Sequence, residues 1–99
     1  MIVKKFLKTK DACDVLFEYA NENATEVALV GDFNDWEPAA MKQAKKAGSP
    51  FRAKVRVPKN GEYQFRYYVD GSYWANDEKA DAYRPNEFGE DNSVVSTYE

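Results

Sequence analysis

Residues 51–74 read FRAKVRVPKNGEYQFRYYVDGSYW, and this stretch decides the fold class. Apolar and polar side chains alternate along residues 51–57 and again along residues 62–70, which is typical of antiparallel strands with one face toward the core. An Asn-Gly pair at 60–61 and an Asp-Gly pair at 70–71 separate these runs, and both pairs favour tight hairpin turns. The stretch therefore predicts three consecutive antiparallel strands joined by two hairpins.

Short apolar runs between turn residues recur along the rest of the chain. Further strands are predicted over residues 14–19, 27–30 and 41–43 and around residues 94–95. Seven or eight short strands in all predict an all-β fold, an immunoglobulin-like β-sandwich of antiparallel strands in two sheets. Because the chain has neither repeats nor linkers, residues 1–99 are expected to form a single domain.

The composition excludes several classes of protein. A content of 43% hydrophobic and 15% aromatic residues indicates a folded chain, and a net charge of −3 without a dense basic stretch argues against nucleic acid as a partner. No run approaches the ~20 apolar residues of a membrane span, and residues 1–10, MIVKKFLKTK, lack the apolar core of a signal peptide. Cys13 is the only cysteine, so no intrachain disulfide is possible and we expect a cytoplasmic protein.

The residues of the chain offer no recognisable catalytic machinery. Histidine, the commonest general base and metal ligand, is absent, and no two of the 17 Asp and Glu residues stand out as a glycosidase pair. Asp77, Glu78 and Asp81 form the densest acidic group, but they lack the regular spacing and turn glycine of a calcium loop. They lie in a charged segment without periodicity, Asn76 to Gly89, for which we expect a long solvated surface loop. We therefore expect no catalytic residue, no metal site and no cofactor.

Aromatic residues in hydrophilic surroundings are the most informative feature for function. Trp36 lies in a polar loop, and Trp74 follows a tight turn beside Tyr73. A pyranose ring packs its C–H face on an aromatic ring, while its hydroxyl groups need hydrogen bonds from planar polar side chains. The candidates for such bonds are Gln64, Arg66 and Asn92. Tryptophan is more often a large core residue, so composition alone leaves both interpretations open.

Three motifs resemble a known family. VALVGDFNDW (27–36), YQFRYYVDG (63–71) and GEDNSVV (89–95) follow the order of the glycogen-binding modules of the AMP-activated protein kinase β subunit and of glycogen branching and debranching enzymes. The resemblance covers about residues 13–97, and the run 63–95 is similar to small stand-alone bacterial proteins named for the isoamylase early set domain. It implies an early-set immunoglobulin-like sandwich that binds α-1,4- and α-1,6-linked glucan, such as glycogen, starch or maltooligosaccharide, without catalysis.

The resemblance also implies a binding face with two tryptophans, a basic residue and an asparagine. Trp36, Arg66 and Asn92 occupy three of the matching positions. The kinase modules place the hairpin tryptophan two residues after the glycine, where this chain has Tyr73, and Trp74 follows one position later. Adjacent strand residues face opposite sides of a sheet, so only one of the two can be the platform. The resemblance to the stand-alone proteins implies a hairpin loop that is one residue longer, and we therefore expect Trp74 to be the platform and Tyr73 to turn aside or flank it.

Two further positions of the expected binding face depart from the kinase modules. Phe88 stands where they have leucine, a tolerable replacement, and Glu90 stands where they have a small hydroxyl residue, which predicts altered or lost affinity. Glu90 and the shifted Trp74 favour an alternative function, a protein-interaction module that docks onto a glucan-metabolising enzyme. Glycoside hydrolase activity is the least expected function, because it rests only on the enzymes that such modules accompany.

Overall fold

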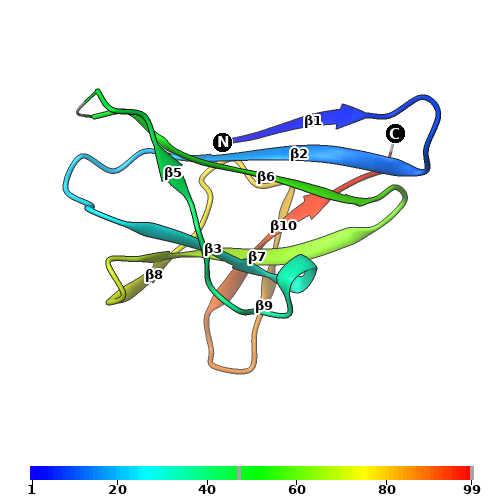
Figure 1. Ribbon diagram of the computed structural model, residues 1–99. Helices are drawn as coiled ribbons and strands as arrows, with labels where there is room; N and C mark the ends of the chain where they lie inside the picture. Colours follow the sequence, from blue (N-terminus) through cyan, green and yellow to red (C-terminus); the bar gives the residue numbers. More distant parts are fainter. Residues whose placement is uncertain (47, 99) are drawn as a thin grey trace.

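Two antiparallel β-sheets packed face to face make up this computed structural model, which describes residues 1–46 and 48–98 (Figure 1). The first sheet has the strand order β1-β2-β6-β5 and the second has the order β4-β3-β7-β10-β9, with β8 also paired to β7. The predicted all-β sandwich is confirmed, and the described residues contain ten strands instead of seven or eight. The elements are β1 (Ile2–Phe6), β2 (Ala12–Tyr19), β3 (Val27–Gly31), the 3₁₀ turn η1 (Asp32–Asn34), β4 (Ala39–Ala40), β5 (Lys42–Gln43), β6 (Phe51–Pro58), β7 (Glu62–Val69), β8 (Tyr73–Ala75), β9 (Ala82–Pro85) and β10 (Asp91–Ser96).

The first predicted hairpin is wrong, although both of its strands exist. β6 pairs with β2 and β5, whereas β7 pairs with β3, β8 and β10, so the two strands lie in opposite sheets. The turn between them bonds to the end of the chain, because the backbone N–H groups of Asn60 and Gly61 donate to the carbonyl and hydroxyl oxygens of Thr97, each at 3.0 Å. The turn therefore carries the chain from one sheet to the other. The second predicted hairpin, which joins β7 to β8, is confirmed.

Three edge strands, β1, β4 and β9, escaped the sequence analysis. β1 pairs with β2. β9, which lies inside the segment 76–89 that we expected to be a loop, pairs with β10. Lysines interrupt the apolar pattern of β1, and β9 ends on Pro85, which is tolerated at a sheet edge. Hydrogen bonding to a neighbouring strand therefore makes β1 and β9 strands, although their local sequence pattern does not predict it.

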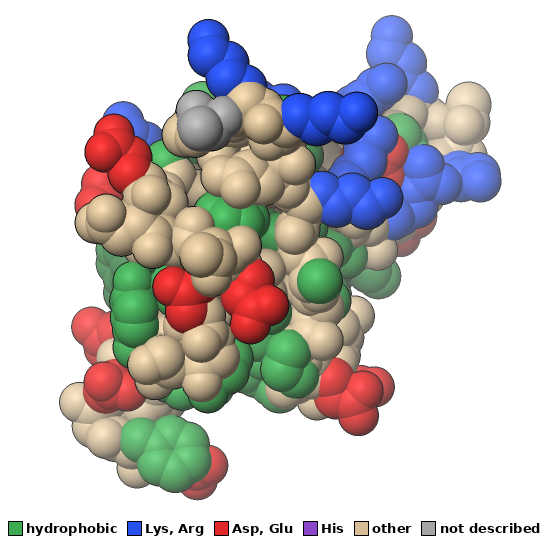
Figure 2. All heavy atoms as spheres, turned by 60° about the vertical axis from the view of Figure 1, so that its left-hand side comes forward, with side chains coloured by type: hydrophobic (Ala, Val, Ile, Leu, Met, Phe, Trp, Pro, Cys, Tyr) green, Lys and Arg blue, Asp and Glu red, His purple; other side chains and the backbone are tan. Residues whose placement is uncertain are grey.

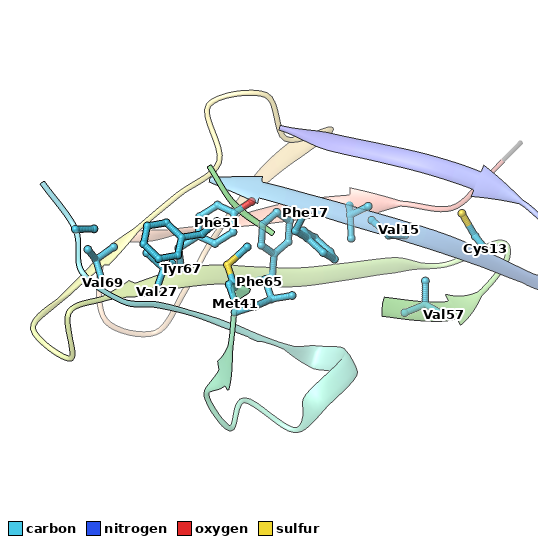
Figure 3. Packing of buried hydrophobic residues seen from close by; sticks show 13 residues of the cluster. Cys13, Val15, Phe17, Val27, Met41, Phe51, Val57, Phe65, Tyr67 and Val69 are labelled. Atoms are coloured by element: carbon cyan, nitrogen blue, oxygen red, sulfur yellow. The ribbon is translucent and has the colours of Figure 1, made fainter. Parts of the chain in front are cut away.

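The core lies between the sheets and is rich in aromatic rings. Figure 3 shows Phe17 and Val15 of the first sheet facing Phe65 and Tyr67 of the second. The ring centroids of Phe17 and Phe65 lie 4.8 Å apart at 67°, an edge-to-face contact of the kind that aromatic pairs favour. Cys13 is fully buried at one end of this core.

The burial of Asp77 contradicts the prediction that the acidic segment after β8 is a solvated loop. Its residue is 2% exposed, and its carboxylate accepts hydrogen bonds from the hydroxyl of Tyr67 at 2.7 Å, the backbone N–H of Lys79 at 2.8 Å and the amino group of Met1 at 2.7 Å. Asp81 pairs with Lys4 at 2.7 Å across the sandwich, and only Glu78 of the three is exposed without such a role. Asp77 is therefore a structural residue of the core boundary.

No helix in the described part of the chain has the length and apolarity that crossing a membrane requires.

Asp70 begins the β7–β8 turn and makes stability depend on pH. Its Oδ1 accepts hydrogen bonds from the backbone N–H groups of Glu26 and Thr25 and from the Thr25 hydroxyl, at 2.8 to 2.9 Å. The bonds from Glu26 and Thr25 lower the pKa of Asp70 below its ordinary value. A lowered folded-state pKa contributes stability that is complete above the unfolded pKa of about 4 and is lost as the pH falls through the folded value.

We expect the variant Asp70→Asn to differ most from the parent at neutral pH. Asparagine keeps an acceptor oxygen and tolerates the positive φ of 53° at this position, but it carries no charge. The difference between the urea midpoints of the two proteins should narrow as the pH falls from about 7 to about 3. Asp35→Asn is the control, since Asp35 also has a positive φ of 56° and its carboxylate has no hydrogen-bond partner among the described residues. A parent–variant difference that stays constant with pH would contradict this account.

Candidate functional site

A cavity of about 750 Å³ lies on the outer face of the second sheet. Its floor comes from β7, β8 and β10, whose alternate side chains point away from the core. Two loops, residues 32–36 and 86–90, rise at its sides. The lining residues are Asp32, Trp36, Gln64, Arg66, Trp74, Asn86, Glu87, Phe88, Glu90 and Asn92.

Trp36 is positioned by the tight turn after β3. Asp35 and Trp36 both have a positive φ, 56° and 58°, a conformation that is rare for a bulky side chain. The backbone N–H of Trp36 donates to the carbonyl of Gly31 at 2.9 Å, and its indole Nε1 donates to Asp32 Oδ1 at 2.8 Å. The ring is thereby held in one orientation while remaining 38% exposed.

Gly31 brings this turn against β7. A Cβ atom at Gly31 would lie 2.7 Å from the carbonyl oxygen of Gln64 and 2.8 Å from Cβ of Phe65, so a larger residue does not fit without a shift of the backbone. Asn34 closes the turn, because its Oδ1 accepts from the N–H of Gly31 at 2.9 Å and its Nδ2 donates to the carbonyl of Leu29 at 3.0 Å. These contacts explain why the segment 31–36 has the form GDFNDW.

The β7–β8 hairpin decides which of two adjacent aromatic residues enters the cavity. Trp74 lies opposite Tyr68 with ring centroids 4.5 Å apart, on the outer face of the sheet. Tyr73 lies opposite Val69, whose side chain is in the core, and its hydroxyl accepts a hydrogen bond from Asn21 Nδ2 at 3.0 Å. Trp74, which is 42% exposed, therefore lines the cavity, and Tyr73 does not.

Arg66 is the cation of the cavity floor. Its side chain is only 9% exposed, and its guanidinium carbon lies 5.3 Å from the ring centroid of Trp74. Nη1 donates to Oε1 of Glu90 at 3.2 Å, whereas the buried Nε has no hydrogen-bond partner among the described residues. Arg66 thus packs under Trp74 and is tied to the loop 86–90.

Three amide side chains form a connected row beside Arg66. Asn86 Nδ2 donates to Asn92 Oδ1 at 3.2 Å, and Asn92 Nδ2 donates to Gln64 Oε1 at 3.0 Å. Asn86 Oδ1 also accepts hydrogen bonds from the backbone N–H groups of Phe88, at 2.9 Å, and Glu90, at 3.1 Å. These bonds fix the conformation of the loop 86–90. Each of these amides has donor and acceptor groups, which suits the hydroxyl groups of a sugar.

Two of the three carboxylates of the cavity, Asp32 and Glu90, are engaged by groups of the protein itself. Asp32 Oδ1 accepts a hydrogen bond from Trp36 Nε1 at 2.8 Å, and Asp32 Oδ2 accepts one from the backbone N–H of Gln64 at 2.7 Å. Both oxygens are therefore bonded to groups of the protein. Glu90 is paired with Arg66. Among the residues that the structure describes, no group of three or more Cys, Asp or Glu side chains is placed to hold a metal ion. The arrangement offers aromatic faces and hydrogen-bonding groups for recognition.

The structure brings together all but one of the residues that the sequence analysis named for the site. One and the same cavity is lined by Trp36, Gln64, Arg66, Trp74, Phe88, Glu90 and Asn92. Tyr73 lies on the other face of the hairpin, as the expected alternation of strand residues implied.

The sequence analysis did not assign Asp32, Asn86 or Glu87 to the site. Asp32 precedes Trp36 by four residues in the same turn, and this spacing was the only local signal for it. Asn86 and Glu87 belong to the segment that we expected to be a loop, and only the pairing of β9 with β10 folds that segment over the sheet.

A family model described as the glycogen recognition site of AMP-activated protein kinase matches residues 13–99, which is most of the chain. The chain belongs to this family. The resemblance inferred from the three motifs is confirmed, and the matched range agrees with the expected range of about 13–97. A comparison with curated proteins found no match.

Members of the glycogen-recognition family are carbohydrate-binding modules, and such modules are non-catalytic. Membership therefore supports binding of a glucan polysaccharide by this chain and gives no support to hydrolysis. The likeness to bacterial stand-alone proteins and the cytoplasmic location stay predictions.

Proposed function

We propose that this chain binds α-glucan in the cavity of the second sheet, with Trp36 and Trp74 as stacking platforms for successive glucose units of an α-1,4-linked chain. Glycogen, starch and maltooligosaccharides present such chains. The observation that carries the proposal is the convergence of two exposed indole rings and a row of amide side chains in one cavity of a glycogen-recognition module.

The polar groups of the floor complement the two rings. The aromatic faces take the C–H face of a pyranose, while Asn92, Gln64 and Arg66 are within the same cavity to exchange hydrogen bonds with the hydroxyl groups. Phe88, which is 80% exposed, adds an apolar surface at the rim. Because each aromatic stack contributes about 1–2 kcal/mol in a hydrated site, we expect a dissociation constant of roughly micromolar to millimolar for a single site.

Loss of either platform tests the proposal. Trp36→Ala and Trp74→Ala should each weaken binding of glycogen about five- to thirtyfold, which corresponds to the loss of one stack of about 1–2 kcal/mol. The measurement is native electrophoresis in gels of increasing glycogen concentration, in which both variants should need about five to thirty times more glycogen than the parent for the same retardation.

Tyr73→Ala is the matched control for the platform variants. Tyr73 is adjacent to Trp74 and is 48% exposed, but it lies outside the cavity, so this variant should be retarded like the parent. Circular dichroism of all variants verifies that they are folded. A parent that glycogen does not retard, or a Trp36→Ala variant with unchanged retardation, would refute the proposed site.

Docking onto a glucan-metabolising enzyme is the second candidate function, and the contact of Glu90 with Arg66 favours it. This contact occupies an N–H group that a sugar hydroxyl would otherwise engage, at 3.2 Å. If this candidate is correct, immobilised parent protein retains such an enzyme from an extract, and glycogen fails to retard the parent in the gel. Good glucan binding without any retained enzyme would rule it out.

A further inference from the structure

The cavity is acidic, and it contains a single cation. Its lining includes the carboxylates of Asp32, Glu87 and Glu90 and the guanidinium of Arg66, a formal excess of two negative charges. Figure 2 shows that Lys and Arg side chains gather along the top and upper right of the molecule, whereas acidic and hydrophobic side chains occupy most of the lower half. The loop between β9 and β10 lies at the bottom of the fold in Figure 1, so the basic side chains that gather on the face drawn in Figure 2 lie toward the opposite end.

The charge of Arg66 is already paired within the protein. Its side chain is nine-tenths buried, its guanidinium lies against Trp74, and Glu90 accepts from Nη1 at 3.2 Å. Arg84 is the neighbour of Asn92 across the β9–β10 pair, but it is bound to Glu62 at 3.3 Å and does not line the cavity. An anion that entered the cavity would therefore meet carboxylates without gaining a free cation.

Glu90 acts on this balance in two ways. Its side chain is 60% exposed at the cavity rim, so it presents negative charge to the ligand and at the same time offsets the charge of Arg66. Asp32, in contrast, directs both of its oxygens to donors of the fold. Replacing Glu90 with a neutral residue would both remove one repulsive charge and release one N–H group of Arg66.

From this charge arrangement we infer that the cavity selects neutral glucan over glucan that carries anionic groups such as phosphate esters, and that Glu90 is the residue that determines this specificity. The inference rests on the proposed function, because it concerns the ligand of the same site. Two unit charges of like sign about 7 Å apart change an affinity by about threefold at the dielectric constant of water and by about fiftyfold at an effective dielectric constant of about 20, so we expect about tenfold at the hydrated rim of the cavity. Salt shortens the range of this repulsion, so the discrimination should weaken as ionic strength rises.

Calorimetric titration with two oligosaccharides tests the inference. The probes are maltoheptaose and maltoheptaose phosphorylated chemically at its primary hydroxyl groups. At about 20 mM salt we expect the parent to bind the neutral probe about tenfold more tightly, and at about 0.5 M salt this ratio should fall below about threefold.

Glu90→Gln and a matched control separate the role of Glu90 from that of net charge. Glu90→Gln keeps the shape of the side chain and should lower the ratio of the two affinities clearly below that of the parent at low salt, although Asp32 and Glu87 keep their charges. Glu22→Gln changes the net charge by the same amount at an exposed position in the turn between β2 and β3, outside the cavity, and should keep the ratio of the parent.

The possible results distinguish this inference from the proposed function. Failure of the parent to bind neutral maltoheptaose would overturn the proposed function and this inference with it. Binding of both probes with equal affinity at low salt would overturn only the selectivity. A Glu90→Gln ratio equal to that of the parent would show that Glu90 does not determine it.

Discussion

Replacing Phe65 with alanine is expected to lower the free energy of unfolding by about 3–5 kcal/mol, the range for loss of a buried aromatic ring. Phe65 is fully buried at the centre of β7, and its ring contacts those of Phe17 and Tyr67 at centroid distances of 4.8 and 5.7 Å (Figure 3). Both sheets contribute to this contact, so the cavity left by alanine cannot close by movement of one side chain. Chemical denaturation followed by tryptophan fluorescence measures the effect.

Phe88→Ala provides the control for Phe65→Ala. Phe88 has the same side chain but is 80% exposed, so its replacement should change the unfolding free energy by less than about 0.5 kcal/mol. A loss of less than about 1 kcal/mol in Phe65→Ala would mean that the core is far looser than the contacts of Phe65 indicate.

Asp77→Ala is expected to lower the free energy of unfolding by about 2–4 kcal/mol, because it leaves the hydroxyl of Tyr67 without its acceptor in the protein interior. Tyr67 is fully buried and donates to Asp77 Oδ2 at 2.7 Å. Burial, followed by the hydrogen bond to Asp77, raises the pKa of Tyr67, so the phenol stays protonated and remains a donor. Equilibrium urea unfolding at neutral pH measures the loss.

A double-mutant cycle separates this hydrogen bond from packing around Asp77. Tyr67→Phe removes the buried donor. The loss of unfolding free energy in the double variant should therefore be smaller, by about 1–2 kcal/mol, than the sum of the losses in the two single variants. Costs that simply add would contradict an energetic link between the two side chains. The cycle also tests whether the segment after β8 is fixed to the core, as the burial of Asp77 indicates.

The candidate site shows how far local patterns reach. Alternation along the hairpin was enough to place Trp74 and Tyr73 on opposite faces, because neighbouring strand residues face opposite sides of a sheet wherever the strand is placed. The family resemblance was needed to predict which of the two faces the cavity. The ion pair of Glu90 with Arg66 had no such signal, since 24 positions separate the two residues and only the approach of the loop 86–90 to β7 brings them together. The departure of Glu90 from the family pattern was visible in the sequence, but its partner was not.

The sequence by itself determined the strand character of most of the chain and the buried faces of β6 and β7, because these depend on steric preferences of adjacent residues and on a two-residue period. It also indicated Trp36 and Trp74 as the tryptophans of the cavity. The tertiary structure alone decided that β6 and β7 lie in opposite sheets, that β1 and β9 are strands and that Asp77 is buried. A turn with Asn-Gly between two alternating runs fits a hairpin as well as a crossing between sheets. The choice depends on which distant strands offer free backbone groups and an apolar face, and such partners are brought together only when the chain folds.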